Sequence, residues 1–402
     1  MRILLVNNFS YVTGGVDRHC LDLAALLRDA GHEVAFLATD ASHRVATDGA
    51  FVPLLVTNET RDGLPLLESA RVATRATWNR TAYAAARRLI DDFAPDVVHL
   101  HKLYPHLSCA PVIAARDAGV PIVQTAHDYE FLSANPFDHT GATVDHAQTR
   151  LRFRALNTVL FEIRKLRHVP LVDAWVTVSQ AMADVYASHG IAARPVPNFT
   201  LVPTGPAPRF EARSGALYAG RLTVDKGVDD IISLARAVPE LDIRVAGFGP
   251  LAHRVSRAAS RIPNLTYLGF LSLEGVQEEL RHSRVCLMPS RWEEPGPLVA
   301  LEAMAAGTPI VAYDHGGLAE YVRNAHAGRV IGTEPMALAA NTAFLCTDVE
   351  EWTKMSANAM AAIHDTHSPD AYLREILAVY AGVTGRPAPA HGSRLSRAVR
   401  AA

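Results

Sequence analysis

Residues 1–37, MRILLVNNFSYVTGGVDRHCLDLAALLRDAGHEVAFL, decide the fold. The apolar runs at residues 3–6 and 34–37 predict two short buried strands. Between them, Gly14-Gly15 closes a loop, apolar residues recur at helical spacing as far as Leu27, and Gly31 ends the helix. A strand, a helix and a second strand in this order predict a parallel β-α-β unit.

The same alternation of strand and helix signals continues along the chain in two blocks. Further mostly apolar runs of three or four residues stand at 97–100, 122–125 and 175–178 in the first block, and at 217–219, 243–246, 285–288 and 310–312 in the second. Helical patterns such as residues 228–236 lie between the runs. We therefore expect an α/β protein with two doubly wound domains, each built on a parallel sheet covered by helices on both faces.

Five prolines between residues 195 and 208 separate the two blocks and predict a stiff linker. We place the N-terminal domain at 1–200 and the C-terminal domain at 205–368. A helix at about 369–383 is expected to pack back on the first domain, and the stretch 384–402, rich in Arg, Ala and Pro, to form a frayed tail. Ligands of open parallel sheets bind beyond the carboxyl ends of the strands, so two facing domains predict a cleft.

The composition argues against several classes of protein. Lys+Arg 39 against Asp+Glu 41 gives a net charge of -2, whereas a dedicated nucleic-acid binder usually has a basic excess. The four cysteines form no C-x-x-C pair, so we expect neither a zinc ribbon nor a disulfide scaffold, and a reducing, cytoplasmic location. The sequence has no run of about 18 uncharged apolar residues, so we expect no membrane-spanning helix.

Two turns after predicted strands have residues suited to an anion. Gly14-Gly15 stands at a helix start, where backbone amides and the helix dipole favour negative charge, although a plain tight turn fits equally well. Arg221 and Lys226 follow the strand at 217–219 and suit a diphosphate, since arginine offers a planar fork and lysine a point charge. The chain has only four lysines, which favours a functional Lys226 over a solvated surface charge.

Two glutamates flank a predicted helix start in the second block. Pro295 and Pro297 keep Glu294 in the loop before the helix, and Glu302 falls one to two turns inside it. Carboxylates at these places can hold the vicinal hydroxyls of a sugar or a ribose, and the loop amides can bind phosphate. The alternative is that Glu294 caps the helix and Glu302 lies on the surface. The apolar neighbours of Glu302 argue against a surface position.

Two histidines follow strands of the first block. His101 comes after the run at 97–100 and His127 after the strand expected at 121–126, so both belong at the cleft. A neutral histidine there can donate to a sugar hydroxyl or assist proton transfer, although structural roles remain open for both. The loops at 104–108 and 133–150 are expected to build the acceptor site.

A helical stretch at 150–168 combines an apolar face with six basic residues. Two interpretations remain open. The stretch packs on its own domain, or its positive face contacts an anionic membrane or an acceptor phosphate.

The sequence resembles family four of the glycosyltransferases, retaining enzymes of the GT-B fold with two Rossmann-like domains around a central cleft. The resemblance runs from Gly14 to about Glu320, and its most specific element is the E-x7-E pair Glu294 and Glu302. Further motifs of the family stand at Gly220-Arg221-Leu222-x3-Lys226-Gly227, Gly247-Phe248-Gly249-Pro250, Gly316-Gly317-x2-Glu320, Val98-His99-Leu100-His101 and Gln124-Thr125-Ala126-His127-Asp128-Tyr129.

The resemblance implies a role for each site residue. Arg221 and Lys226 would hold the donor diphosphate, Glu302 the ribose and Glu294 the donor sugar, with His127 near the reacting carbon. The other substrate-binding positions would be Gly14, Gly15, His101, Tyr104, Phe270, Leu271, Gly296, Pro297, Leu298 and Val299, with the backbone near Phe270 and Leu271 reading the base.

The chain departs from the family at one position that contacts the donor. Where many members have Phe-Gly, it has Gly296-Pro297, and Pro297 lacks the amide N–H expected to touch the donor. This departure leaves the identity of the donor sugar open.

We therefore expect a retaining, metal-independent glycosyltransferase that needs no cofactor and moves a hexose-type sugar from a UDP- or GDP-sugar to a hydroxyl acceptor. The acceptor would be a glycan, a glycolipid or a specialised metabolite, in the cytoplasm or at the inner face of the membrane. A non-catalytic nucleotide-sugar-binding protein is the alternative, which the four retained charged residues oppose. A nicotinamide-dependent dehydrogenase would need a G-x-G-x-x-G turn, and residues 7–15 have none.

Overall fold

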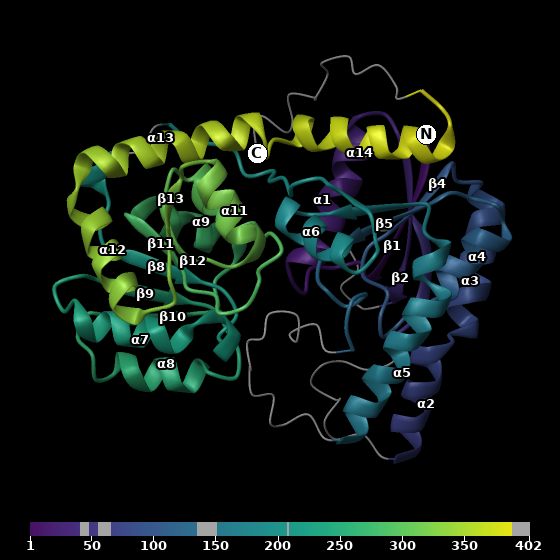
Figure 1. Cartoon of the computed structure of the whole chain (residues 1–402), viewed down its shortest axis with the longest axis horizontal. Helices are drawn as coiled ribbons and strands as arrows, with labels where there is room; N and C mark the ends of the chain where they lie inside the picture. Colours follow the sequence, from purple (N-terminus) through teal and green to yellow (C-terminus); the bar gives the residue numbers. More distant parts are fainter. Residues whose placement is uncertain (41–47, 55–65, 135–150, 207–208, 388–402) are drawn as a thin grey trace.

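The computed structural model describes residues 1–40, 48–54, 66–134, 151–206 and 209–387. Two α/β lobes lie side by side, and two long helices, α13 (Val349–Asp365) and α14 (Pro369–Thr384), run along one side across both lobes (Figure 1). The predicted tail falls almost wholly outside the described residues, as does most of the predicted acceptor loop at 133–150.

The first lobe is built on a seven-stranded parallel sheet with the strand order β3-β2-β1-β4-β5-β6-β7. Its strands are β1 (Arg2–Phe9), β2 (Glu33–Asp40), β3 (Gly49–Pro53), β4 (Val97–Leu100), β5 (Ile122–Ala126), β6 (Ala174–Thr177) and β7 (Ala193–Pro195). Its helices are α1 (Gly15–Asp29), α2 (Leu66–Thr77), α3 (Arg80–Phe93), α4 (Ala110–Asp117), α5 (Leu151–Arg167) and α6 (Gln180–Ser188).

The second lobe has a six-stranded parallel sheet with the order β10-β9-β8-β11-β12-β13. Its strands are β8 (Ala216–Ala219), β9 (Ile243–Ala246), β10 (Leu265–Gly269), β11 (Val285–Met288), β12 (Ile310–Tyr313) and β13 (Gly328–Ile331). Its helices are α7 (Val228–Ala237), α8 (Ala252–Ala259), α9 (Leu273–His282), α10 (Leu298–Ala305), α11 (Gly316–Asn324) and α12 (Pro335–Thr347).

Both sheets are doubly wound, which confirms the predicted fold class. The strand order reverses between β1 and β4 in the first sheet and between β8 and β11 in the second. A crevice forms at such a reversal, beyond the carboxyl ends of the strands. The segments after these four strands contain Gly14-Gly15, His101, Arg221 and Glu294, so the topology alone directs the predicted residues toward the two crevices.

The strands that the sequence analysis did not predict are β3, β7, β10 and β13, which lie at the edges of the two sheets. Their residues are mostly half-buried or exposed, so they lack the continuous apolar runs of central strands. The prediction of a plain linker at 195–208 was also wrong in its first part. Pro195 ends β7, and Val196 and Phe199 are buried in the core of the first lobe.

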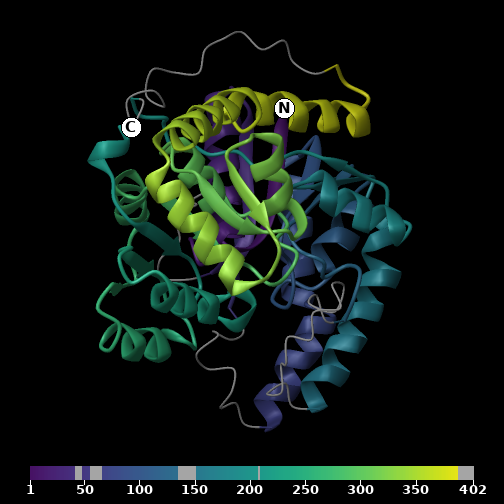
Figure 2. The same ribbon diagram turned by 60° about the vertical axis from the view of Figure 1, so that its left-hand side comes forward.

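The C-terminal helix α14 packs on the first sheet rather than on the second. Its buried residues Tyr372, Ile376 and Tyr380 share one apolar cluster with α1 and the central strands. The chain therefore crosses between the lobes twice, and two hydrogen bonds join the two crossing segments. The His367 ring donates to the Asn198 carbonyl at 2.7 Å, and the Thr200 N–H donates to the His367 carbonyl at 3.2 Å. Figure 2 shows α13 and α14 following one another across the lobes.

Helix α5 lies beside α2 at the far end of the first lobe (Figure 1). Leu160 and Arg164 are buried, and the Arg164 guanidinium lies over the Tyr104 ring. Val159 and Leu166, which belong to the predicted apolar face of this stretch, are exposed. Among the described residues, no helix has the length and apolar character needed to cross a membrane.

Candidate active site

A cavity of about 490 Å³ lies between the two lobes and is lined by both. Lining residues come from the segments after β1 and β5 in the first lobe, and from the segments after β8, β9, β10 and β11 in the second. The structure brings thirteen of the predicted site residues to this cavity: Gly14, Gly15, His127, Arg221, Lys226, Phe270, Leu271, Glu294, Gly296, Pro297, Leu298, Val299 and Glu302.

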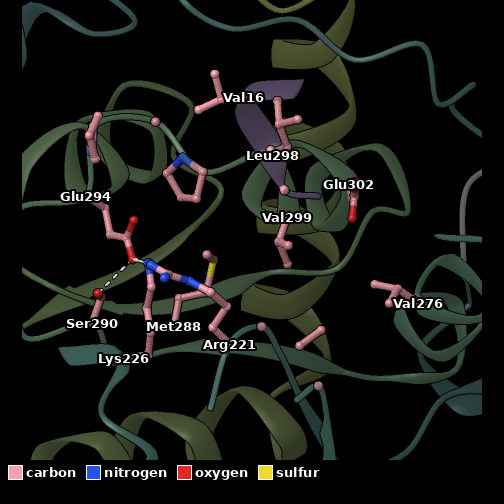
Figure 3. Close-up of a pocket in the computed structure, with 18 of the residues that line it drawn as sticks. Val16, Arg221, Lys226, Val276, Met288, Ser290, Glu294, Leu298, Val299 and Glu302 are labelled. Carbon is pink, nitrogen blue, oxygen red and sulfur yellow. Dashed lines mark hydrogen bonds and ion pairs between the residues drawn. The ribbon is translucent and has the colours of Figure 1, made fainter. Parts of the chain in front are cut away.

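Two helix N-termini meet at the cavity, one from each lobe. Helix α1 begins at Gly15 and α10 begins at Leu298. A Cβ atom placed on Gly15 would lie 3.8 Å from the Leu298 side chain, and Figure 3 shows Val16 beside Leu298. The first amides of a helix have no partner within the helix, and its dipole is positive at this end. Together the two N-termini make a region that favours an anion.

Lys226 reaches the cavity through a tight turn. It ends a short 3₁₀ helix, η5 (Val224–Lys226), and Gly227 then takes a φ of 69° before α7 begins. A Cβ atom on Gly227 would lie 2.0 Å from the Pro289 carbonyl oxygen, so only glycine allows this approach. The ammonium of Lys226 lies 5.3 Å from the centre of the Trp292 ring, and the exposed Arg221 lies nearby (Figure 3).

Glu294 lies in the loop before α10, as the flanking prolines predict, and Pro297 caps the helix. The Glu294 side chain is buried, accepts a hydrogen bond of 2.8 Å from the Ser290 hydroxyl and forms an ion pair with Lys226 (Figure 3). These bonds to a buried carboxylate fix its direction toward the cavity.

Glu302 lies inside α10 and pairs with a residue of the opposite lobe. The residue is 4% exposed, and its carboxylate lies 2.5 Å from the guanidinium of Arg18 on α1. The same guanidinium approaches Asp22 at 3.5 Å. Burial raises the pKa of Glu302 above its ordinary value of 4.5, and the charge of Arg18 opposes this rise. The sequence analysis missed Arg18, because nothing in its own segment indicates a partner 284 positions away.

Three histidines gather at the side of the cavity formed by the first lobe. His127 is half-buried at the cavity, and its Nε2 lies 2.9 Å from Nδ1 of His101. His101 is buried behind it and does not line the cavity. His19 of α1, which the sequence analysis did not select, lines the cavity with its ring 5.1 Å from that of His127.

Burial keeps these three imidazoles neutral. It lowers the pKa of His19 from 6.5 to about 3 and the pKa of His101 and His127 well below 6.5, and neighbouring histidines lower the pKa of the latter two further. A neutral imidazole has one nitrogen that donates and one that accepts.

The structure does not bring Tyr104 to the cavity. The residue is 4% exposed, and its hydroxyl lies 3.3 Å from Nδ1 of His168 in the core of the first lobe. His106, Leu107 and Ser108 of the same predicted acceptor loop are also buried.

Two aromatic side chains form an apolar wall of the cavity. Phe248 is 54% exposed and Phe270 is 71% exposed, and their rings pack edge to face with centres 5.7 Å apart. Large exposed aromatic residues at a cavity indicate a surface on which a flat group can stack.

The motif Gly316-Gly317-x2-Glu320 fixes one lobe against the other. The Glu320 carboxylate accepts hydrogen bonds of 3.0 and 2.6 Å from the N–H groups of Gln180 and Ala181 at the start of α6. This carboxylate of the second lobe therefore caps a helix of the first lobe and satisfies two amides that α6 leaves free.

Two family models match the chain. The model described as "Glycosyltransferase Family 4" matches residues 13–202, and the model described as "Glycosyl transferases group 1" matches residues 208–361. The glycogen synthase of Mycobacterium tuberculosis is 31% identical, with 82% of this chain and 81% of that protein covered. The phosphatidyl-myo-inositol mannosyltransferase of Mycolicibacterium smegmatis is 26% identical over the same shares of the two chains.

Solved structures share the fold over almost the whole chain. The sucrose-phosphate synthase of Thermosynechococcus elongatus superposes with a TM-score of 0.71 at 17% identity, covering 96% of this chain and 99% of the other. The Anabaena HepE structure in complex with UDP gives a TM-score of 0.65 at 17% identity, with coverages of 95% and 100%. The two doubly wound lobes and the similar solved structures show the GT-B fold. The sequence matches show that the chain belongs to the family-4 glycosyltransferases.

Proposed function

We propose that this glycosyltransferase moves a hexose-type sugar from UDP-sugar or GDP-sugar to a hydroxyl acceptor, with retention of configuration and without a metal ion. The observation that carries the proposal is the meeting of two helix N-termini, Arg221 and Lys226 at one cavity. This combination suits a diphosphate. The complex of HepE with UDP supports a nucleotide donor at the same kind of fold.

The diphosphate would lie between the starts of α1 and α10. Charge builds up on its oxygens as the glycosidic bond breaks, so Arg221 and Lys226 would stabilise the leaving group more strongly in the transition state than in the ground state. This is the role that a bound metal ion has in other transferases. The amides of Leu298 and Val299 in the first turn of α10 would add two donors, whereas Pro297 has none to offer.

The nucleoside would occupy the part of the cavity near Glu302, Phe248 and Phe270. The Glu302 carboxylate would accept hydrogen bonds from the ribose hydroxyls while Arg18 holds its other side. The two exposed aromatic rings would cover the base, with the backbone near Phe270 and Leu271 reading its edge. Stacking tolerates every base, so these contacts fit both uracil and guanine.

Glu294 and His127 would surround the donor sugar from opposite lobes. Glu294 is held by Lys226 and Ser290, which favours hydrogen bonding to sugar hydroxyls over covalent attack on the anomeric carbon. His127 would donate an N–H to a sugar hydroxyl near the reacting carbon. The anomeric carbon–oxygen bond would break toward an oxocarbenium-like state. The acceptor oxygen would then bond on the same face, and its proton would pass to the departing phosphate oxygen.

The acceptor would enter from the first lobe, and we place the reaction in the cytoplasm. A glycan, a lipid-linked acceptor and a small metabolite all fit a site of this kind. Contact with the inner face of a membrane through α5 would involve its exposed Val159 and Leu166 together with Lys165 and Arg167. The name of the mannosyltransferase relative, which includes the lipid phosphatidyl-myo-inositol, supports a lipid-linked acceptor.

A thermal-shift screen against nucleoside diphosphates and their sugars tests the donor. We expect UDP or GDP to raise the melting temperature, and the matching nucleotide sugar to be turned over when labelled. Binding without turnover with any acceptor or water would favour the alternative of a non-catalytic nucleotide-sugar-binding protein. If no nucleoside diphosphate shifts the melting temperature, the proposal is wrong.

A further inference from the structure

His19, His101 and His127 each place a ring nitrogen within 4.8 Å of the other two. They come from three separate segments, α1 and the loops after β4 and β5, that meet at the carboxyl edge of the first sheet. We propose that this three-histidine cluster binds a divalent transition-metal ion of the zinc class, and that the bound ion inhibits the transfer reaction by occupying His127.

Two of the three nitrogen atoms are already close to the spacing of zinc ligands. Nδ1 of His101 and Nε2 of His127 face one another at 2.9 Å and share one proton. A tetrahedral zinc ion with bonds of about 2.0–2.1 Å holds two nitrogens about 3.3 Å apart, so this pair needs to open by only a few tenths of an ångström. The shared proton would move to Nε2 of His101, a buried atom without a hydrogen-bond partner among the described residues.

His19 has the bonding pattern of a metal ligand. Its Nε2 lies 3.0 Å from the Tyr372 hydroxyl on α14, which orients the ring. Its Nδ1 is buried and has no hydrogen-bond partner in the described parts of the chain. A ligating histidine usually has one ring nitrogen held by an outer partner and the other directed at the metal. A buried nitrogen without a partner is otherwise unfavourable, so the unpartnered Nδ1 of His19 is an indication of a ligand.

Charge and access also favour a cation at this place. The ammonium of Lys102 is the positive group next to the cluster, and it is paired with both Asp128 and Glu130, two carboxylates against one cation. His19 and His127 line the cavity, which gives the ion a path of entry and leaves a fourth position for water. Neutral imidazoles suit zinc, copper and nickel, and three histidines with an open position can bind zinc tetrahedrally.

Metal binding can be measured without any donor or acceptor. Full-length protein stripped with chelator and dialysed would be titrated with Zn²⁺ by calorimetry, and with Co²⁺ by its visible absorption, which is strong in tetrahedral sites. The variants would be His19→Gln and His101→Gln. The control would be His253→Gln, an exposed histidine on α8 in the other lobe. We expect one ion per wild-type chain, at least tenfold weaker binding in both cluster variants, and an unchanged control.

Equal affinity in wild type and folded cluster variants would place the ion on surface histidines and overturn the proposal, as would the absence of binding to the wild type. If a buried variant fails to fold, as judged by circular dichroism, His127→Gln at the cavity surface replaces it in the same titration. The readout is binding alone, so it does not depend on whether the proposed reaction occurs.

The inhibitory effect rests on the proposed function and needs a second measurement. Zn²⁺ should lower donor turnover by wild-type protein over the concentration range in which it binds, and excess chelator should restore the full rate. Binding of Zn²⁺ without loss of turnover would overturn the inhibitory part. Absence of turnover under every metal-free condition would instead contradict the proposed function and leave the binding result untouched.

Discussion

Glu294 and Glu302, the two carboxylates of the E-x7-E pair, each pair with a basic residue, but the partners come from different lobes. Lys226 belongs to the same lobe as Glu294, whereas Arg18 reaches Glu302 from the first lobe. The glutamates are buried and the basic side chains are at most 17% exposed, so these charges are screened less than charges at the surface. A donor diphosphate would therefore compete with Glu294 for the ammonium of Lys226. The Glu302 carboxylate would keep its bond to Arg18 while it accepts from the ribose.

Glu302→Ala should weaken nucleotide binding about ten- to hundredfold. A hydrogen bond to a charged group contributes about 1.5–3 kcal/mol, which corresponds to this range in the dissociation constant. Calorimetric titration with the preferred nucleoside diphosphate measures the change, and Glu293→Ala serves as a control because Glu293 is half-buried beside the site without lining the cavity. Unchanged affinity in a folded Glu302→Ala protein would refute the ribose role.

Lys226→Ala should lower kcat at least about a hundredfold, since a donor that stabilises charge formed in the transition state is lost. Arg221→Lys should not restore the wild-type rate, because lysine lacks the planar fork of arginine. Steady-state kinetics over a range of donor concentrations separates kcat from KM for the donor. A Lys226→Ala protein that changes only KM for the donor would show that Lys226 binds the ground state alone.

At the scale of elements, α1 and α10 are joined across the cavity by Arg18 and Glu302. Burial raises the pKa of Glu302, and Arg18 opposes the rise. Without Arg18, the carboxylate should take up a proton at a higher pH, and a protonated Glu302 is a weaker acceptor for ribose hydroxyls. In Arg18→Ala, nucleotide affinity should therefore begin to fall at a higher pH than in wild type as the pH is lowered from 8 to 5.

The matched control is Arg18→Lys, which keeps a positive charge near Glu302 and should retain most of the wild-type pH profile. The measurement is the dissociation constant of the nucleotide between pH 8 and 5 for wild type, Arg18→Ala and Arg18→Lys. Superimposable profiles of wild type and Arg18→Ala would contradict the coupling between the two helices.

The elements predicted from sequence were the central ones. Strands β1, β4, β9 and β11 are mostly apolar because helices cover them on both faces, and this composition identifies them directly. Edge strands lack that signal. Strand β13 begins with glycine and has no fully buried residue, and β7 has three residues and ends in proline.

The candidate site could be predicted where its residues immediately follow a central strand or start a helix. Arg221 follows β8, and Leu298 begins α10, so topology places them at a crevice. Arg18 and His19 gave no such signal, since they lie inside α1 and matter only through partners far along the chain. Tyr104 shows the opposite error: its loop starts at a crevice, but its side chain turns into the core.

At the scale of the whole molecule, the chain buries many neutral histidines. Burial is the main cause that lowers the pKa of each below 6.5: to about 3 for His19, His99 and His168, to about 4 for His106 and His367, and well below 6.5 for His101 and His127. Below pH 6.5 the unfolded chain therefore binds more protons than the folded one, and the free energy of unfolding falls with falling pH.

Stability should accordingly decrease between pH 7.5 and 5.5, with a slope of up to about 1.4 kcal/mol per pH unit for each such histidine once the pH is well below 6.5. Urea denaturation at several pH values in this window measures the slope. His99→Gln should reduce it, if the variant folds, while His253→Gln on the surface should not. A free energy of unfolding that is constant across the window would contradict the neutral, buried state of these residues.

The measurement that tests the central claim most directly is turnover of labelled UDP- and GDP-sugars by wild type and Lys226→Ala in excess chelator. The account predicts that wild type releases nucleoside diphosphate from at least one of these donors at a rate that chelator does not lower. It also predicts that the product keeps the anomeric configuration of the donor, and that kcat falls at least about a hundredfold in Lys226→Ala. Activity that chelator abolishes and Mn²⁺ or Mg²⁺ restores, an inverted product, or full kcat in the variant would contradict it.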